Sequence, residues 1–250
     1  MSELADRVAA HPGWYHTIDL PDGLETPGFA DLRPFAPQAL PDSLAGKRCL
    51  DVGTFDGFWA FSLEARGPEV VYALDLPDGT QADWPPNTRE ENLAASRATG
   101  LEWGSGFKLA HEALGSAVRR IEGNVYDLNP GWTDGPVDVL LCGTILQHLR
   151  DPTGALERMR ETLKPGGTLL MIEAYSVPMT RRHRNLAVAE YRPSVAGSQF
   201  TWWMPNIATL RGWATTAGFV ETGEPIAKHK PVKNSGKGDH VCRLTFTAPG

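Results

Sequence analysis

Short apolar runs alternate with amphipathic stretches from residue 46 to the end of the chain, and most of these runs stop at a glycine or an acidic residue. The runs predict strands at 48–52, 69–74, 118–122, 137–142 and 168–172, and a closing pair of strands at 220–226 and 240–247. Apolar positions at helical spacing predict helices at 57–65, 87–98, 107–114, 153–163 and 206–217. This alternation is typical of an α/β fold, with a mostly parallel sheet and helices on both faces.

Two segments lack the regular pattern. Residues 1–45 are rich in Pro and Gly, carry several aromatic side chains and predict one short helix at 2–10. We expect them to pack over the main domain, either as a cap that brings Trp14, Tyr15 and Arg33 into an active site or as a plain packed extension. Residues 174–205 are irregular, and such a long segment inside a compact domain is usually functional. The chain is therefore predicted to comprise an N-terminal cap, 1–45, and a main domain, 46–250, with a substrate-side insertion at 174–205.

The composition is that of an ordinary globular protein, with 41% hydrophobic and 22% charged residues. No apolar run reaches the roughly 18 residues of a membrane span, and the N-terminus lacks the apolar region of a signal peptide. Cys49, Cys142 and Cys242 are far apart and set in apolar runs, which favours reduced, buried thiols in a cytoplasmic protein. A homo-oligomer is compatible with these features.

The charge pattern bears on partners. A net charge of −6 disfavours broad nucleic-acid binding. Two local basic stretches, 181–184 (RRHR) and 228–237 (KHKPVKNSGK), leave RNA binding open, although solvated loops are the simpler interpretation of both. The chain shows no metal-ligand cluster, so we predict no metal site.

The strongest local motif is residues 48–61, RCLDVGTFDGFWAF, in which an apolar strand leads through a glycine turn into a helix. Gly53 and Gly57 let the backbone approach a ligand closely, and the helix start offers free N–H groups to an anion. Phe55 stands where a dinucleotide-binding motif has its middle glycine, which favours a small carboxylate over a phosphate. A glycine turn without a ligand is the alternative. Asp75, at the end of the next strand, could accept hydrogen bonds from both hydroxyls of a ribose.

With the later motifs added, the sequence resembles class I S-adenosylmethionine (SAM)-dependent methyltransferases. The resemblance covers about 46–226 and rests on DVGTFDGF, VVYALD, GNVYDL, VDVLLCGTILQHLRDP, LKPGGTLLMIE and a final helix ending AGF. It implies a Rossmann-like, seven-stranded sheet with an antiparallel final strand, and SAM as the methyl donor. The cofactor-binding residues that it implies are Asp51, Gly53, Thr54 and Gly57 around the methionine part, Asp75 at the ribose, Leu76 against the adenine, Asn124 and Val125 at the adenine edge, and Cys142 and Gly143 under the sulfonium. Viewed alone, Asn124 is equally consistent with a simple turn.

Within this class, YHTIDLPDGLETPGF, GTILQHLRDP, LLMIEA and WWMPNIATLRGWATTAGF are similar to tRNA wobble-uridine methyltransferases, the 5-methoxyuridine and 5-carboxymethoxyuridine enzymes. Some of that family use carboxy-SAM and transfer a carboxymethyl group. The sequence departs from the family at Gln147, where a tyrosine is expected, and near Arg33, where a lysine is expected; the long N-terminal extension of the carboxymethyl enzymes is also missing. These departures disfavour carboxy-SAM and tRNA, and they favour a small-molecule acceptor.

Candidate catalytic residues follow the central strands. His148 comes after the fourth strand and is the leading candidate base, because imidazole titrates near neutral pH. Glu173 ends the fifth strand and could orient an acceptor or accept its proton. Structural roles are the alternative for both. The candidate substrate-binding residues lie in the cap, in the insertion and at the start of the last helix: Trp14, Tyr15, Arg33, Tyr175, Tyr191, Trp202, Trp203 and Asn206. Asn206 is also a natural N-cap for the last helix.

Three functions are compatible with the sequence. The first is a SAM-dependent methyltransferase that acts on an O or N atom of a small polar acceptor, aromatic acceptors included. The second is a tRNA wobble-uridine methyltransferase or carboxymethyltransferase. The third is a SAM-binding protein without catalysis.

Overall fold

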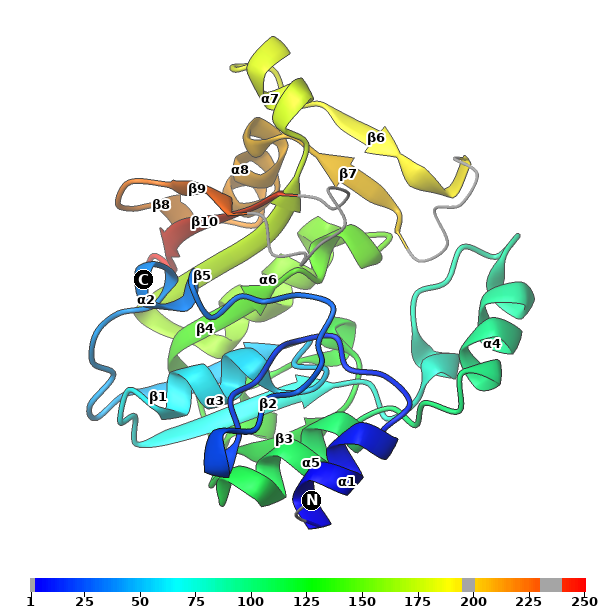
Figure 1. The fold of residues 1–250 in the computed structure, drawn as a ribbon. Helices are drawn as coiled ribbons and strands as arrows, with labels where there is room; N and C mark the ends of the chain where they lie inside the picture. Colours follow the sequence, from blue (N-terminus) through cyan, green and yellow to red (C-terminus); the bar gives the residue numbers. More distant parts are fainter. Residues whose placement is uncertain (1–2, 195–200, 230–239) are drawn as a thin grey trace.

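The structure is a computed structural model that describes residues 3–194, 201–229 and 240–250 (Figure 1). Its main sheet has the strand order β3–β2–β1–β4–β5–β10–β8, with β9 paired to β10. These strands are β1 (Arg48–Val52), β2 (Val70–Asp75), β3 (Arg119–Glu122), β4 (Val137–Gly143), β5 (Leu163–Tyr175), β8 (Val220–Glu221), β9 (Ile226–His229) and β10 (His240–Thr247). Strands β1 to β5 pair in parallel, and β10 runs antiparallel to β5. The predicted seven-stranded, mostly parallel sheet is confirmed, and β9 joins it as an eighth strand.

Helices cover both faces of the sheet. The α-helices are α1 (Glu3–Ala10), α2 (Ala36–Ala39), α3 (Phe58–Glu64), α4 (Arg89–Ala98), α5 (Ser105–Leu114), α6 (Pro152–Thr162), α7 (Val177–Arg182) and α8 (Ile207–Thr216). The 3-10 helices are η1 (Pro21–Gly23), η2 (Gly79–Gln81), η3 (Val125–Asp127), η4 (Pro130–Thr133), η5 (Leu146–His148) and η6 (Arg192–Ser194). None of the described helices is long and apolar enough to cross a membrane.

The core consists of two large hydrophobic clusters, one on each face of the sheet. Cys49 and Leu141 belong to the cluster under α3 and α5, whereas their neighbours Leu50 and Leu140 belong to the cluster under α6 and α8. Side chains alternate between faces along a strand, so an unbroken apolar run is needed where both faces are covered. This explains why the central strands β1 and β4 were easy to predict.

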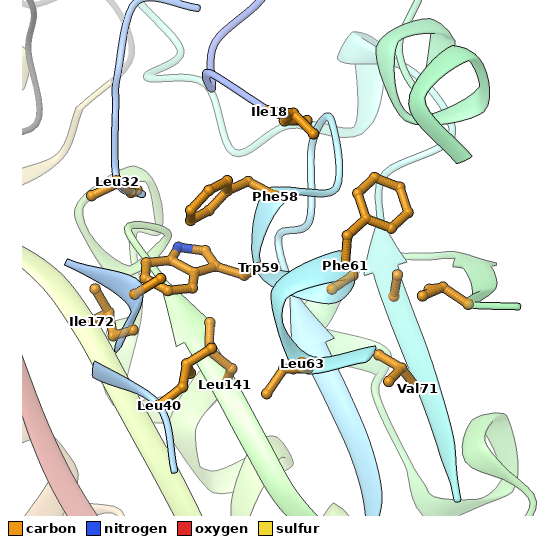
Figure 2. Close-up of a cluster of buried hydrophobic side chains, with 14 of the residues drawn as sticks. Ile18, Leu32, Leu40, Phe58, Trp59, Phe61, Leu63, Val71, Leu141 and Ile172 are labelled. Carbon is orange, nitrogen blue, oxygen red and sulfur yellow. The ribbon is translucent and has the colours of Figure 1, made fainter. Parts of the chain in front are cut away.

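The N-terminal segment packs over α3. Ile18 and Leu32 from this segment lie close to Phe58 and Trp59 of α3 within one buried cluster (Figure 2). The segment is held in shape by its own hydrogen bonds, such as Thr17 N to Ala30 O at 2.8 Å. Its core is therefore continuous with that of the main domain.

The insertion at 174–205 contains α7 and a small hairpin of β6 (Ala189–Tyr191) and β7 (Trp203–Pro205), none of which the sequence pattern predicted. The hairpin extends from the body above the ends of the sheet strands (Figure 1). Residues 195–200 of the insertion lie outside the described residues, as does most of the basic stretch 228–237.

Candidate active site

A cavity of about 390 Å³ opens at the carboxyl ends of the parallel strands. This is the edge at which open α/β sheets bind their ligands. Its wall is formed by residues after β1 (Gly53, Phe55), at the end of β2 (Asp75, Leu76), after β3 (Asn124, Val125) and at the end of β4 (Gly143, Thr144), together with Tyr15, His16, Asp83, Trp84, Trp103, Ile145 and His148.

The glycine turn after β1 brings backbone close to the cavity. Gly53 has φ +77°, and a Cβ there would lie 2.9 Å from Cδ1 of Ile145. Gly57 has φ +95°, but a Cβ there would collide with the rings of Phe61 and Phe107 rather than enter the cavity. The two glycines therefore differ: Gly53 opens the cavity, whereas Gly57 permits close packing of α3.

Asp51 and Thr54 are buried beneath the turn. The Thr54 hydroxyl lies next to the Asp51 carboxylate, and its interaction with that carboxylate opposes the effect of burial on the pKa of Asp51. Burial raises the pKa of Asp51 to about 7. Neither residue lines the cavity.

The carboxylate of Asp75 is fixed by two backbone amides. Leu76 N donates to Oδ1 at 2.7 Å, and Phe55 N donates to Oδ2. Burial raises the pKa of Asp75, and these two hydrogen bonds oppose the shift. Each oxygen keeps a further lone pair, so the carboxylate at the cavity wall can accept hydrogen bonds from two neighbouring hydroxyls.

Asn124 and Val125 line the same cavity. The side-chain oxygen of Asn124 accepts from Tyr126 N at 3.1 Å and caps η3. Its side-chain nitrogen donates to Gln81 O at 3.3 Å. The amide thus holds the turn in shape, and the backbone around it forms the wall of the cavity.

Glu173 lies beneath the loop that follows β4 and does not line the cavity. Its Oε1 accepts from Ile145 N at 3.1 Å, from Leu146 N at 3.2 Å and from Cys142 Sγ at 3.3 Å. Burial raises the pKa of Glu173 to about 8. The carboxyl group is committed to holding this loop, in which Thr144 adopts φ +58°.

His148 ends the same loop and lines the cavity. Its Nε2 lies 3.2 Å from the side-chain nitrogen of Gln147. An amide nitrogen can only donate, so Nε2 of His148 is the acceptor in this contact. The predicted base therefore reaches the cavity with Nε2 already in a hydrogen bond.

A polar network joins the insertion to the cavity wall through Asp83. Its Oδ2 accepts from Tyr126 Oη at 2.9 Å and from Arg150 N at 2.7 Å, and the Arg150 guanidinium pairs with Oδ1 at 3.2 Å. The indole of Trp202 donates to Asp83 O at 2.5 Å and lies under the guanidinium of Arg150, which is 4.8 Å from the ring centroid. Trp203 donates to Arg150 O at 3.3 Å. Both tryptophans anchor the insertion and do not line the cavity.

Of the other predicted substrate-binding residues, Tyr15 alone is among the described residues that line the cavity. Trp14 and Tyr175 are buried in the two hydrophobic clusters. Arg33 is held by the carboxylates of Asp19, Glu25 and Asp31. Tyr191 is 49% exposed on the hairpin, and Asn206 caps α8 by accepting from Thr209 N at 2.9 Å. Cys142, which was predicted as a cofactor-binding residue, is fully buried under the loop that follows β4.

The sequence analysis missed several parts of the wall. His16, Asp83, Trp84 and Trp103 all line the cavity. Three of them come from the segment between β2 and α5, which held only a loop and a helix in the prediction. In that segment, Trp84 near the end of a polar loop was the one local signal that a side chain packs into the cavity wall.

The sequence of residues 27–221 matches a family described as a methyltransferase domain. The chain therefore belongs to this family, which confirms the predicted class. Residues of the chain are 30% identical to a ubiquinone biosynthesis O-methyltransferase of Bordetella bronchiseptica over 130 residues, which is 52% of this chain and 44% of the relative. They are 25% identical to a tRNA U34 carboxymethyltransferase of Desulfotalea psychrophila over 182 residues, 73% of this chain and 48% of the relative. The chain spans about half the length of the curated relatives it matches.

Solved structures show the same fold. The N-terminal domain of EvdMO1 with S-adenosylhomocysteine (SAH) bound has a TM-score of 0.58 and 17% identity, over 100% of this chain and 98% of that one. The N-methyltransferase NodS of Bradyrhizobium japonicum in complex with SAH has a TM-score of 0.53 and 16% identity, over 100% of both chains. At this identity the likeness shows the fold, and the acceptor must be inferred from the site.

Proposed function

We propose that the protein is a SAM-dependent methyltransferase that acts on an O or N atom of a small, polar acceptor, with aromatic acceptors favoured. The observation that carries the proposal is the Asp75 carboxylate, held by Phe55 N and Leu76 N at the wall of a cavity that also contains the Gly53 turn. A bound nucleoside needs a group that accepts hydrogen bonds from its ribose hydroxyls and a backbone that can approach it closely.

The residues divide the work of holding SAM. Asp75 would accept hydrogen bonds from the ribose hydroxyls, and Leu76 with Val125 would enclose the adenine. The backbone at Gly53 would bind the polar end of the methionine part, next to the buried carboxylate of Asp51. When bound, SAM supplies a methyl group on a positively charged sulfur, so the chain needs only to position an acceptor and remove its proton.

The cavity wall favours a small acceptor without negative charge. Among the described residues, its lining contains no Lys or Arg, and it includes the rings of Tyr15, Phe55 and Trp103. A volume of about 390 Å³ is near the lower end of ligand pockets, which span roughly 300–1,000 Å³. SAM would fill most of this volume. The space that remains suits a compact acceptor that packs against aromatic rings.

Glu173 acts in this proposal as a positioning residue, because it contacts the loop of Ile145 and Leu146 and not the cavity. His148 remains a candidate to contact the acceptor. Tyr15 is the proposed acceptor contact from the cap.

A panel of acceptors tests the proposal. The protein is incubated with SAM and catechol, a small aromatic amine or unmodified tRNA, and mass spectrometry measures SAH and the methylated product. SAH formation with a small acceptor, insensitive to ribonuclease, supports the proposal. Turnover with tRNA alone would overturn the acceptor class, and a protein that neither binds SAH nor forms it would overturn the activity.

A tRNA acceptor is the second candidate, favoured by three exposed arginines at the end of α7, Arg181, Arg182 and Arg184. Phosphate contacts by such residues make binding salt-dependent. Replacing Arg181 and Arg182 with Glu would then weaken tRNA binding and reduce its salt slope. The matched control is Arg158→Glu, an exposed arginine on α6. Equal effects of both changes would count against this candidate.

A further inference from the structure

A buried carboxylate in the glycine turn holds a histidine of the N-terminal segment. Asp56 follows Phe55 in the turn, and its Oδ2 accepts from Tyr15 N at 3.0 Å and from His16 N at 2.8 Å. Its Oδ1 pairs with Nδ1 of His16, and both side chains are almost fully buried, 3% and 8% exposed. Asp56 therefore holds His16 both by its backbone amide and by its ring nitrogen Nδ1.

The imidazole of His16 is also held by neighbouring rings. It stacks on Phe58 with ring centroids 5.4 Å apart and meets Tyr15 edge-on at 4.7 Å. Within the described part of the chain Nε2 makes no hydrogen bond, and His16 lines the cavity. A carboxylate that accepts from Nδ1–H fixes the tautomer in which Nε2 carries the lone pair. The ring is therefore set up as an acceptor of protons from the cavity.

His148 is the second histidine of the cavity wall. Its Nε2 lies 3.2 Å from the side-chain nitrogen of Gln147. His16 has an orienting carboxylate at Nδ1, and the residue lines the cavity, which are two features expected of a histidine base.

We propose that the Asp56–His16 pair is the general base for methyl transfer, an inference that rests on the proposed function. Nε2 of His16 takes the proton from the acceptor O–H or N–H as the acceptor lone pair forms its bond to the methyl carbon. The electron pair of the broken carbon–sulfur bond remains on sulfur. The Asp56 carboxylate keeps its contact with Nδ1 and stabilises the imidazolium, and the proton passes to water when the product leaves.

Nitrogen-15 NMR of the imidazole rings tests the pair without any acceptor. In the wild-type protein at neutral pH, His16 should show a protonated Nδ1 and an unprotonated Nε2. Asp56→Asn keeps an oxygen for the amides of Tyr15 and His16 but presents an NH2 group to Nδ1, so the proton should move to Nε2. A wild-type His16 with its proton on Nε2 would overturn the proposal.

Turnover gives the second readout, with whichever acceptor of the panel the wild type methylates. His16→Asn and Asp56→Asn should each lower kcat by about 100- to 10,000-fold, the usual contribution of a general base. Their affinity for SAH, measured by calorimetry, should change less than threefold. The matched control is His148→Asn, which should lower kcat by a smaller factor. If His16→Asn retains wild-type kcat, the base is elsewhere; if the wild type fails to bind SAH, the proposed function itself fails.

Discussion

Gly53→Ala tests whether the turn after β1 shapes the cavity. Gly53 has φ +77°, a conformation that costs an L-residue about 1–2 kcal/mol. The new Cβ would also lie 2.9 Å from Cδ1 and 3.2 Å from Cβ of Ile145, and displacing a packed side chain costs about 1–3 kcal/mol. The total loss of stability is therefore about 2–5 kcal/mol. Because Ile145 lines the cavity, its displacement should narrow the site for SAM.

Gly46→Ala is the matched control. Gly46 has a similar φ of +69°, but no atom lies within 4 Å of a Cβ built there. It should lose only the conformational part, about 1–2 kcal/mol. Urea denaturation measures stability, and calorimetry with SAH measures affinity. Gly53→Ala should bind SAH at least tenfold more weakly, while Gly46→Ala binds like the wild type. Equal affinities for the two variants would refute the placement of the ligand beside Gly53.

The buried residues give two further predictions. Burial raises the pKa of Glu173 from near 4.5 to about 8, so between these values the folded protein holds a proton that the unfolded chain has released. The free energy of unfolding of the wild type should therefore fall as pH rises through this window. From pH 4.5 to pH 8.5, the free energy of unfolding of Glu173→Gln relative to that of the wild type should rise by on the order of 4 kcal/mol, measured by urea denaturation. A constant difference would contradict the buried, protonated carboxyl. Asn206→Ala removes the α8 cap and the hydrogen bonds to His183 O and Leu186 O, and should cost about 3 kcal/mol in urea, with Thr215→Ala as an exposed control. A loss no greater than that of the control would mean that Asn206 does not hold the insertion.

The parts of the fold that local patterns determine were predictable. β1 was predicted with its observed bounds, Arg48–Val52, because the apolar run ends at a glycine with positive φ. β5 is longer than the predicted 168–172, since Leu163 already pairs with Val137 and the far end pairs with β10. Pairing with distant strands extends a strand beyond its own apolar run, and the local sequence carries no trace of this.

The site was predictable where the motif is local and unpredictable where contacts are distant. Asp75 and Gly53 follow strands and line the cavity as expected from their positions. Arg33 looked free to reach a substrate, yet three carboxylates of its own segment hold it. Asp56 gave no signal, because its partner His16 lies 40 residues earlier in the chain. Such roles depend on which segments meet in space.

Calorimetric titration with SAH tests the central claim most directly, because it requires no acceptor. Wild-type protein should bind SAH at one site per chain. Asp75→Asn keeps the size of the side chain but loses the charge that strengthens hydrogen bonds from the ribose hydroxyls, and it should bind at least tenfold more weakly. The control Asp78→Asn, in the exposed cap of η2, should bind like the wild type. A folded wild-type protein that gives no binding heat at several temperatures would contradict the account, and equal binding by Asp75→Asn would remove Asp75 from the site.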